Sequence, residues 1–431
     1  MARPNILYLH THDMGRYAQP YGYPVPTPNI QKLAEGGVTF RNCFCSTPTC
    51  SASRAALLTG MYPHRNGMLG LAHRGWSLYD YSWHIIHTLR TVGYHSALCG
   101  VQHISRDPHQ IGYDAVITTA AKVTEAAPRA AEWLTNSPPR PFFLSVGFSD
   151  THRDFRQPGP DEDPRWCRAP DPLPDNETTR RDMAGFKAEA REVDRGMGLV
   201  LDALERTGLA DQTIVICTTD HGIAFPHMKC NLTDHGIAVM MIIRGPGGFG
   251  GGKVLDAMVQ HLDVFPTLCE VVGLEKPGRL DGESLLPLVR GEADEIHDAI
   301  YTEVTYHAAY EPMRAVRTTR YKFIKRFDGR GRPNLPNCDD SPSKDFWLAH
   351  GWRERPVSEE ELFDLVFDPH EACNRIADPA YQGVAAELRQ RLDDWMHQTD
   401  DPLLKGPVPA PPGARVNDPD GLSPREPARE V

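Results

Sequence analysis

Short runs of consecutive apolar residues alternate along this chain with stretches in which apolar residues recur every three or four positions. The short runs predict buried strands at residues 6–9, 96–99, 142–146, 214–218 and 239–243. Strands that read as unbroken apolar runs are typical of a parallel sheet covered on both faces by helices. The alternation therefore predicts an α/β fold with a doubly wound, mostly parallel sheet.

Helical spacing is clearest in the middle of the chain. The apolar residues that share one predicted helical face are Met183, Phe186, Ala190, Val193, Met197, Val200 and Leu204. We interpret this stripe as core packing and not as a cofactor site. Shorter helices are predicted at residues 29–35, before Gly36-Gly37, and at residues 84–92, before Gly93.

The pattern changes near Asp298 to short alternating strands. These are predicted at residues 299–305, 313–317 and 321–326, and a helix is predicted around residues 385–397. The last residues are dense in proline, glycine and arginine, and are predicted to be extended or disordered. We therefore expect a large domain at residues 1–297, a smaller C-terminal α+β domain at 298–404, and a tail at 405–431.

Composition restricts the classes of partner. The 46 basic and 57 acidic residues give a net charge of −11, which argues against a nucleic-acid or anionic membrane surface. No apolar run approaches the roughly 20 residues of a membrane span. The ten cysteines show no zinc-site spacing and predict reduced thiols in a cytoplasmic protein. An anionic substrate would need a locally positive pocket.

Polar side chains follow four of the predicted strands. They are His12 and Asp13, His103, Asp150 and His152, and Asp220 and His221. Ligands of such sheets bind outside the carboxyl ends of the strands, so this convergence predicts an active site. Two Asp–His pairs suit a divalent metal such as Mn, Fe or Zn, because the ligation mixes oxygen and nitrogen. The alternative is that each Asp caps a loop and each His binds a carbonyl.

Cys50 is a candidate nucleophile. It follows Pro48-Thr49 and opens a predicted helix, where free backbone N–H groups and the helix dipole favour an anion. Arg54 lies one turn later on the same face, and could hold a deprotonated nucleophile or a bound oxyanion. The alternative is an ordinary buried cysteine.

These residues lie in motifs that resemble a known family. The segment Cys50-Ser51-Ala52-Ser53-Arg54, followed by Thr59-Gly60, is similar to the signature of type I sulfatases of the alkaline phosphatase superfamily. Further matches are Pro4-Asn-Ile, Thr27-Pro-Asn-Ile, Gly100 to His103, Thr219-Asp-His-Gly222 and Glu361-Leu-Phe-Asp. The resemblance covers nearly the whole chain. Among branches, the chain looks most like bacterial relatives of the heparan N-sulfatase (sulfamidase) group.

The resemblance implies a hydrolase of sulfate esters or N-sulfates of a sugar or small organic molecule. A maturation enzyme would oxidise Cys50 to formylglycine, and one divalent ion (Mn, Ca, Zn or Fe) would activate it. The implied metal ligands are His12, Asp13, Cys50, Asp220 and His221. The implied catalytic residues are Cys50, Arg54, which stabilises the formylglycine, His103, which handles its hydrate, His152, which protonates the leaving group, and Lys229, which binds the sulfate.

Three residues depart from the family pattern. Ala52 stands where the signature usually has proline, His12 where an aspartate is usual, and Val101 where a sulfate-binding lysine is usual. Two alternatives therefore stay open: a phosphodiesterase or phosphonate monoester hydrolase using the same site, and an inactive anion-binding homologue with an unmodified Cys50. The loop at 153–180, with His307, Tyr310 and Arg314, is expected to set specificity, and a homo-oligomer is left open.

Overall fold

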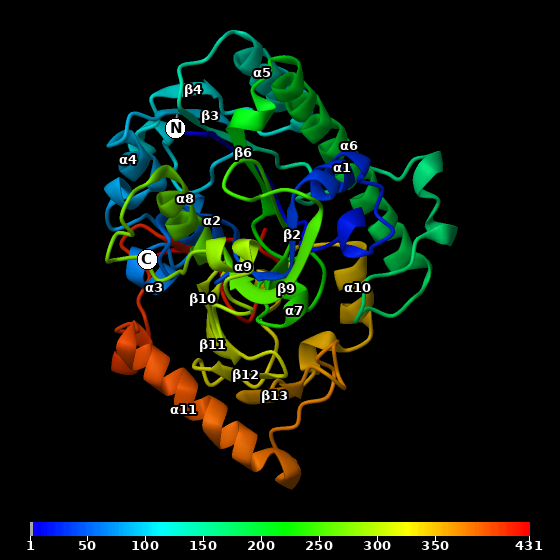
Figure 1. Ribbon diagram of the computed structural model, residues 1–431. Coiled ribbons are helices and arrows are strands. Elements are labelled where there is room, and N and C mark those ends of the chain that lie inside the picture. Colours follow the sequence, from blue (N-terminus) through cyan, green and yellow to red (C-terminus); the bar gives the residue numbers. More distant parts are fainter. Residues whose placement is uncertain (1–2) are drawn as a thin grey trace.

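The computed structural model describes residues 3–431, and a nine-stranded sheet organises the larger part of that range (Figure 1). The strands are β1 (Asn5–Thr11), β2 (Val38–Phe44), β3 (His95–Gly100), β4 (Ala115–Thr118), β5 (Phe142–Gly147), β6 (Thr213–Thr219), β7 (Ala238–Val239), β8 (Met241–Arg244) and β9 (Lys253–Gln260). Their order is β4-β3-β5-β1-β6-β8-β2-β7, with β9 paired to β2. Only β7 and β8 run against the others in this sheet of residues 3–431, which confirms a mostly parallel sheet.

Helices cover both faces of the sheet, as the unbroken apolar strands predicted. Ile6 and Tyr8 of β1 face one core, and Leu7 and Leu9 face the other. The first core is closed by α2 (Cys50–Thr59), α4 (Ile85–Arg90) and α8 (Val264–Val272). The second core is closed by α1 (Pro28–Gly36), α5 (Val123–Thr135) and α6 (Glu177–Arg206). The doubly wound α/β prediction is therefore confirmed.

Some local predictions are wrong. The single strand at 239–243 is divided into β7 and β8, each antiparallel to β2, and the N–H of Met240 between them donates to the carbonyl of Gly15 at 2.9 Å. Strands β2 and β9 were not predicted, since polar residues interrupt both. The helix α6 starts at Glu177, so it includes the end of the predicted 153–180 loop. Six helices were also not predicted: α3 (Pro63–Asn66), α5, α7 (Asp234–Ile237), α8, α9 (Leu286–Arg290) and α10 (Pro342–Ala349).

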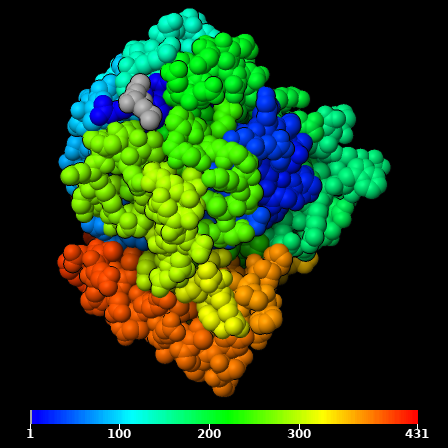
Figure 2. Space-filling model, viewed as in Figure 1, coloured from blue at the N-terminus to red at the C-terminus, as the bar shows by residue number. Residues whose placement is uncertain are grey.

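A four-stranded antiparallel sheet forms the lower part of the molecule (Figures 1 and 2). It consists of β10 (Ile300–Tyr306), β11 (Tyr310–Arg317), β12 (Tyr321–Arg326) and β13 (Glu360–Asp364), in that order. The helix α11 (Gln382–Gln398) packs on β11 and β12, and α10 (Pro342–Ala349) contacts α6. Trp395 of α11 stacks on Tyr301 of β10, which joins the helix to the sheet.

The C-terminal tail is extended and packed against the rest of the chain. Its strands β14 (Arg415–Val416) and β15 (Arg429–Glu430) pair with each other. Asn417 is buried, and its Oδ1 accepts a hydrogen bond from Arg74. Within residues 3–431, no helix combines the length and the apolar character needed to cross a bilayer. All ten cysteines are free thiols.

Candidate active site

The pairing of β1 with β6 brings two Asp–His pairs together. Thr11 at the end of β1 is in register with Thr219 at the end of β6, so the residues that follow meet at the same sheet edge. The backbone N–H of Asp13 donates to Asp220 Oδ1 at 2.8 Å. Asp13 adopts a left-handed conformation with φ of 41°, and this bend turns the chain across the sheet edge. The predicted convergence of the two pairs is thus present.

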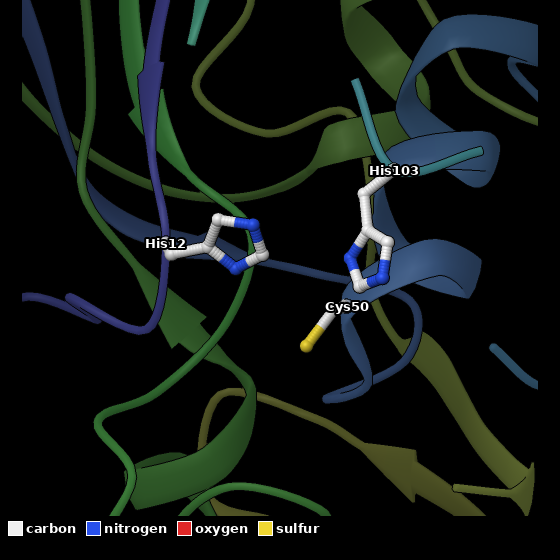
Figure 3. Close-up of side chains that lie close together, drawn as sticks. All are labelled: His12, Cys50 and His103. Atoms are coloured by element: carbon white, nitrogen blue, oxygen red, sulfur yellow. The ribbon is translucent and has the colours of Figure 1, made fainter. Parts of the chain in front are cut away.

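Cys50 joins this group from the first turn of α2. Its Sγ lies 3.3 Å from His221 Nε2 and 4.0 Å from Asp13 Oδ1. His12 approaches from the end of β1 and His103 from the loop after β3, and Figure 3 shows how these two imidazoles and the thiol converge. Burial raises the pKa of the Cys50 thiol well above its usual range. Unmodified Cys50 is therefore a neutral, weak nucleophile.

The residues present fit a divalent cation. His12, Asp13, Cys50 and Asp220 offer ligand atoms that lie within 4.8 Å of one another, and all four residues are buried. His12 Nδ1 makes no hydrogen bond to any group of residues 3–431, although Asp220 Oδ2 is 3.1 Å away. His221 donates from Nδ1 to the carbonyl of Gly222, so its Nε2 faces the cluster as an acceptor.

The two carboxylates of the cluster are ionised. Burial by itself would raise their pKa, but the neighbouring cations outweigh it. Lys229 above all holds the pKa of Asp13 well below its usual range. Paired anions beside an unpartnered imidazole nitrogen form a ligand set for Mn, Zn, Fe or Ca.

Arg54 is buried below the cluster and orients Asp220. Its Nη2 donates to Asp220 Oδ2 at 3.0 Å and to the carbonyl of Thr11 at 2.9 Å, while its Nη1 donates to His10 Nδ1 at 2.5 Å. The side chain lies on the same helix as Cys50, one turn later, as predicted. Its contacts show that it holds the ends of β1 and β6 together. Sequence reasoning missed His10, which reads as an ordinary strand residue.

Lys229 lies on the other side of Asp13. Its Nζ is 2.8 Å from Asp13 Oδ2 and 2.8 Å from Asp339 Oδ2. His152 Nε2 is 3.3 Å from the same ammonium, and His152 Nδ1 donates to the carbonyl of Arg153 at 2.7 Å. Lys229 and His152 are therefore brought together with Asp13 as predicted. Asp339 was missed, because nothing in the sequence around it separates it from an ordinary acidic loop.

His103 approaches the cluster from the loop after β3. Its Nε2 lies 3.0 Å from Nδ1 of His73, and its buried Nδ1 has no hydrogen-bond partner within residues 3–431. Burial, together with His12, His73 and Arg54, lowers the pKa of His103 well below its usual range. His103 is therefore neutral. His73, which orients it, was also missed by sequence reasoning.

Several sequence candidates lie away from the cluster. Asp150 accepts from the N–H of Val123 at 2.8 Å and caps α5 instead of reaching the site. The expectation that Arg314 sets specificity is wrong, since it is fully buried against Asp401, with Nε 2.5 Å from Oδ2. Tyr310 is occupied by the tail: its hydroxyl accepts from the N–H of Val408 at 3.1 Å.

A family model described as Sulfatase matches residues 4–274, which is more than half of the chain. The chain belongs to the sulfatase family. A second model, described as N-sulphoglucosamine sulphohydrolase, C-terminal, matches residues 227–344. This family assignment makes the chain a sulfuric ester hydrolase, as the resemblance implied.

Curated relatives agree with the family, and a solved structure shares the fold. The chain is 28% identical to the N-sulphoglucosamine sulphohydrolase of Homo sapiens, over 94% of this chain and 92% of the relative. It is 29% identical to an ulvan-active sulfatase of Formosa agariphila, over 91% of this chain and 75% of that protein. A solved structure described as a 2-O GAG sulfatase shares the fold with a TM-score of 0.73, at 23% identity, covering 98% of this chain and 99% of its own.

Proposed function

We propose that the chain hydrolyses a sulfate ester or N-sulfate of a saccharide at the cluster around Cys50. The observation that carries this proposal is the position of Cys50 at the start of α2, within ligand distance of Asp13, Asp220 and His12. Formylglycine made from Cys50 would supply a hydrated aldehyde as nucleophile, activated by a divalent ion held by His12, Asp13, Asp220 and His221.

The charges of the pocket suit a transferring group with one negative charge. Asp13, Asp220 and Asp339 are opposed by Arg54 and Lys229, so the bare pocket carries about one net negative charge. A bound divalent ion would reverse that sign. Lys229 would then neutralise the sulfate oxygens at its Nζ, which Asp13 and Asp339 hold in place.

His152 is the proton donor in this proposal. Its Nδ1 is fixed by the carbonyl of Arg153, and its Nε2 faces Lys229 and Asp13. A proton on Nε2 would pass to the leaving alcohol or amine. His103, held neutral by its surroundings, would accept a proton at Nδ1 to regenerate the site.

Mass and activity measurements on matched proteins test the proposal. The chain is expressed with and without a formylglycine-generating maturation enzyme, and a Cys50→Ala variant serves as the control. The Cys50 peptide should exchange sulfur for oxygen and lose two hydrogens only with the maturase, and that sample alone, supplied with manganese, should cleave an aryl sulfate. A converted protein that cleaves an aryl phosphonate faster than an aryl sulfate would favour the phosphonate hydrolase reading. Unconverted Cys50 with no turnover would favour the anion-binding one.

The proposal also places the protein in a reducing compartment of the cell. Ten free thiols support a reducing compartment, because disulfides persist in oxidising ones. Labelling of intact cells with a membrane-impermeant thiol reagent tests this. Exposed Cys373 should react only after lysis.

A further inference from the structure

Three arginines without an acidic partner lie beside the candidate active site. Arg74, Arg106 and Arg415 form no ion pair with any carboxylate of residues 3–431. They come from separate segments: Arg74 ends a short 3-10 helix, Arg106 follows the loop that carries His103, and Arg415 belongs to β14 of the tail. Segments far apart in the sequence thus place three arginines without acidic partners around His73.

A chain of contacts fixes this group next to the reaction centre. His73 lies 3.0 Å from His103, and Arg106 donates from Nη2 to the carbonyl of His73 at 3.1 Å. Arg74, which follows His73 in the sequence, donates from Nη1 to Asn417 Oδ1 at 2.6 Å and to the carbonyl of Arg415 at 3.4 Å. The tail is therefore held against the His73–His103 side of the site.

The charges of these arginines are left uncompensated. Arg425 of the tail, by contrast, is neutralised by a carboxylate: its Nη2 lies 2.8 Å from both oxygens of Asp154. For Arg74, burial and the neighbouring Arg415 lower the pKa, as expected for like charges held close together. Guanidinium groups bind carboxylates and sulfates through paired hydrogen bonds. An anion placed here would remove the repulsion.

We propose that Arg74, Arg106 and Arg415 form a subsite for a second anionic group of the substrate. The group is a carboxylate or a further sulfate, carried on the saccharide beside the sulfate that is cleaved. This inference rests on the proposed function and specifies its substrate class: a saccharide with at least two anionic groups. The tail then contributes to substrate specificity through Arg415. No motif in the sequence predicted this role.

Kinetics on two substrates test the subsite. An aryl sulfate offers one anion, and an N-sulfated disaccharide that carries a uronic acid offers two. Arg106→Ala and Arg415→Ala are both made at exposed positions, and exposed Arg129 of α5, which also lacks an acidic partner within residues 3–431, gives the control Arg129→Ala. Each subsite variant should lose about 10- to 100-fold in kcat/KM on the disaccharide, mainly through KM. That loss should exceed the loss on the aryl sulfate by at least about tenfold.

Binding gives a readout that does not depend on turnover. The same disaccharide, and a version whose carboxyl is reduced to an alcohol, are titrated into a Cys50→Ala protein with and without Arg106→Ala. The carboxylate form should bind about tenfold more weakly to the double variant than to the Cys50→Ala protein. The alcohol form should bind both proteins with the same affinity. Equal effects on both forms, or on both kinetic substrates, would overturn the subsite. No turnover of either substrate by converted wild-type protein would instead count against the proposed function.

Discussion

Arg54 is the side chain whose replacement should couple stability to metal affinity. It is 2% exposed and is the only arginine or lysine within hydrogen-bond distance of Asp220 Oδ2 among residues 3–431. The other carboxylate oxygen, Oδ1, accepts from the N–H groups of Asp13 and His221 at 2.8 and 2.9 Å. Arg54→Met would therefore leave one anionic oxygen, the Thr11 carbonyl and His10 Nδ1 without their donor.

The expected cost follows from these lost contacts. Removing one partner of a buried ion pair typically costs about 3–5 kcal/mol. Arg54→Lys keeps the charge but not the fork that reaches three acceptors, so it should lose about half as much. Manganese affinity should also fall about 10- to 100-fold, because Asp220 loses the group that orients it.

Urea denaturation and calorimetric titration with manganese measure the two effects. The midpoint should shift at constant slope, which assigns the change to stability and not to the unfolded state. Exposed Arg129→Met is the matched control and should be neutral within about 0.5 kcal/mol. A loss below about 1 kcal/mol for Arg54→Met, with unchanged manganese affinity, would refute the role given to Arg54.

Three further outcomes are expected. Manganese at about 100 times its Kd should stabilise the converted protein by about 2.7 kcal/mol, and Asp13→Asn should abolish this gain in thermal melts. Asp339→Asn should tighten inhibition by free sulfate several-fold, because Lys229 loses one of its two carboxylate partners; a weaker inhibition constant would contradict this. Burial lowers the pKa of His84 to about 3, and its neutral Nδ1 accepts from the N–H of Ile86 at the start of α4. Since the folded state resists this protonation, stability present at pH 7 should fall as the pH drops below about 6.5, by up to about 1.4 kcal/mol per pH unit. His84→Asn keeps a cap acceptor and should show a shallower slope in unfolding experiments between pH 7 and pH 5.

The parts of this fold that could be predicted are those whose pattern is local. Unbroken apolar runs are sufficient to identify β1, β5 and β6, because both faces of a central parallel strand are buried. Strands β2 and β9 carry polar residues and lie toward the edge, where alternation is less regular. Their positions depend on pairing with each other, which no local pattern encodes.

The candidate site likewise contains residues that could be predicted from local pattern and residues that could not. His12, Asp13, Asp220 and His221 could be placed together because parallel strands share an edge. Asp339 and His73 could not, since Asp339 lies in a loop and His73 in a three-residue 3-10 helix, and the position of both depends on the whole fold. Arg314 shows the opposite error: this charged residue of the predicted smaller domain was expected to set specificity, but in the structure it is buried against Asp401.

The depth of Cys50 has a consequence for the order of biosynthetic events. The residue is 1% exposed, sits in the first turn of α2, and is covered by the ends of β1 and β6. An oxidising enzyme would have to bind several residues on either side of Cys50. In the folded protein those residues are already helical and buried. Conversion of Cys50 should therefore take place before the chain folds. A maturase added to folded, purified protein should leave Cys50 unmodified.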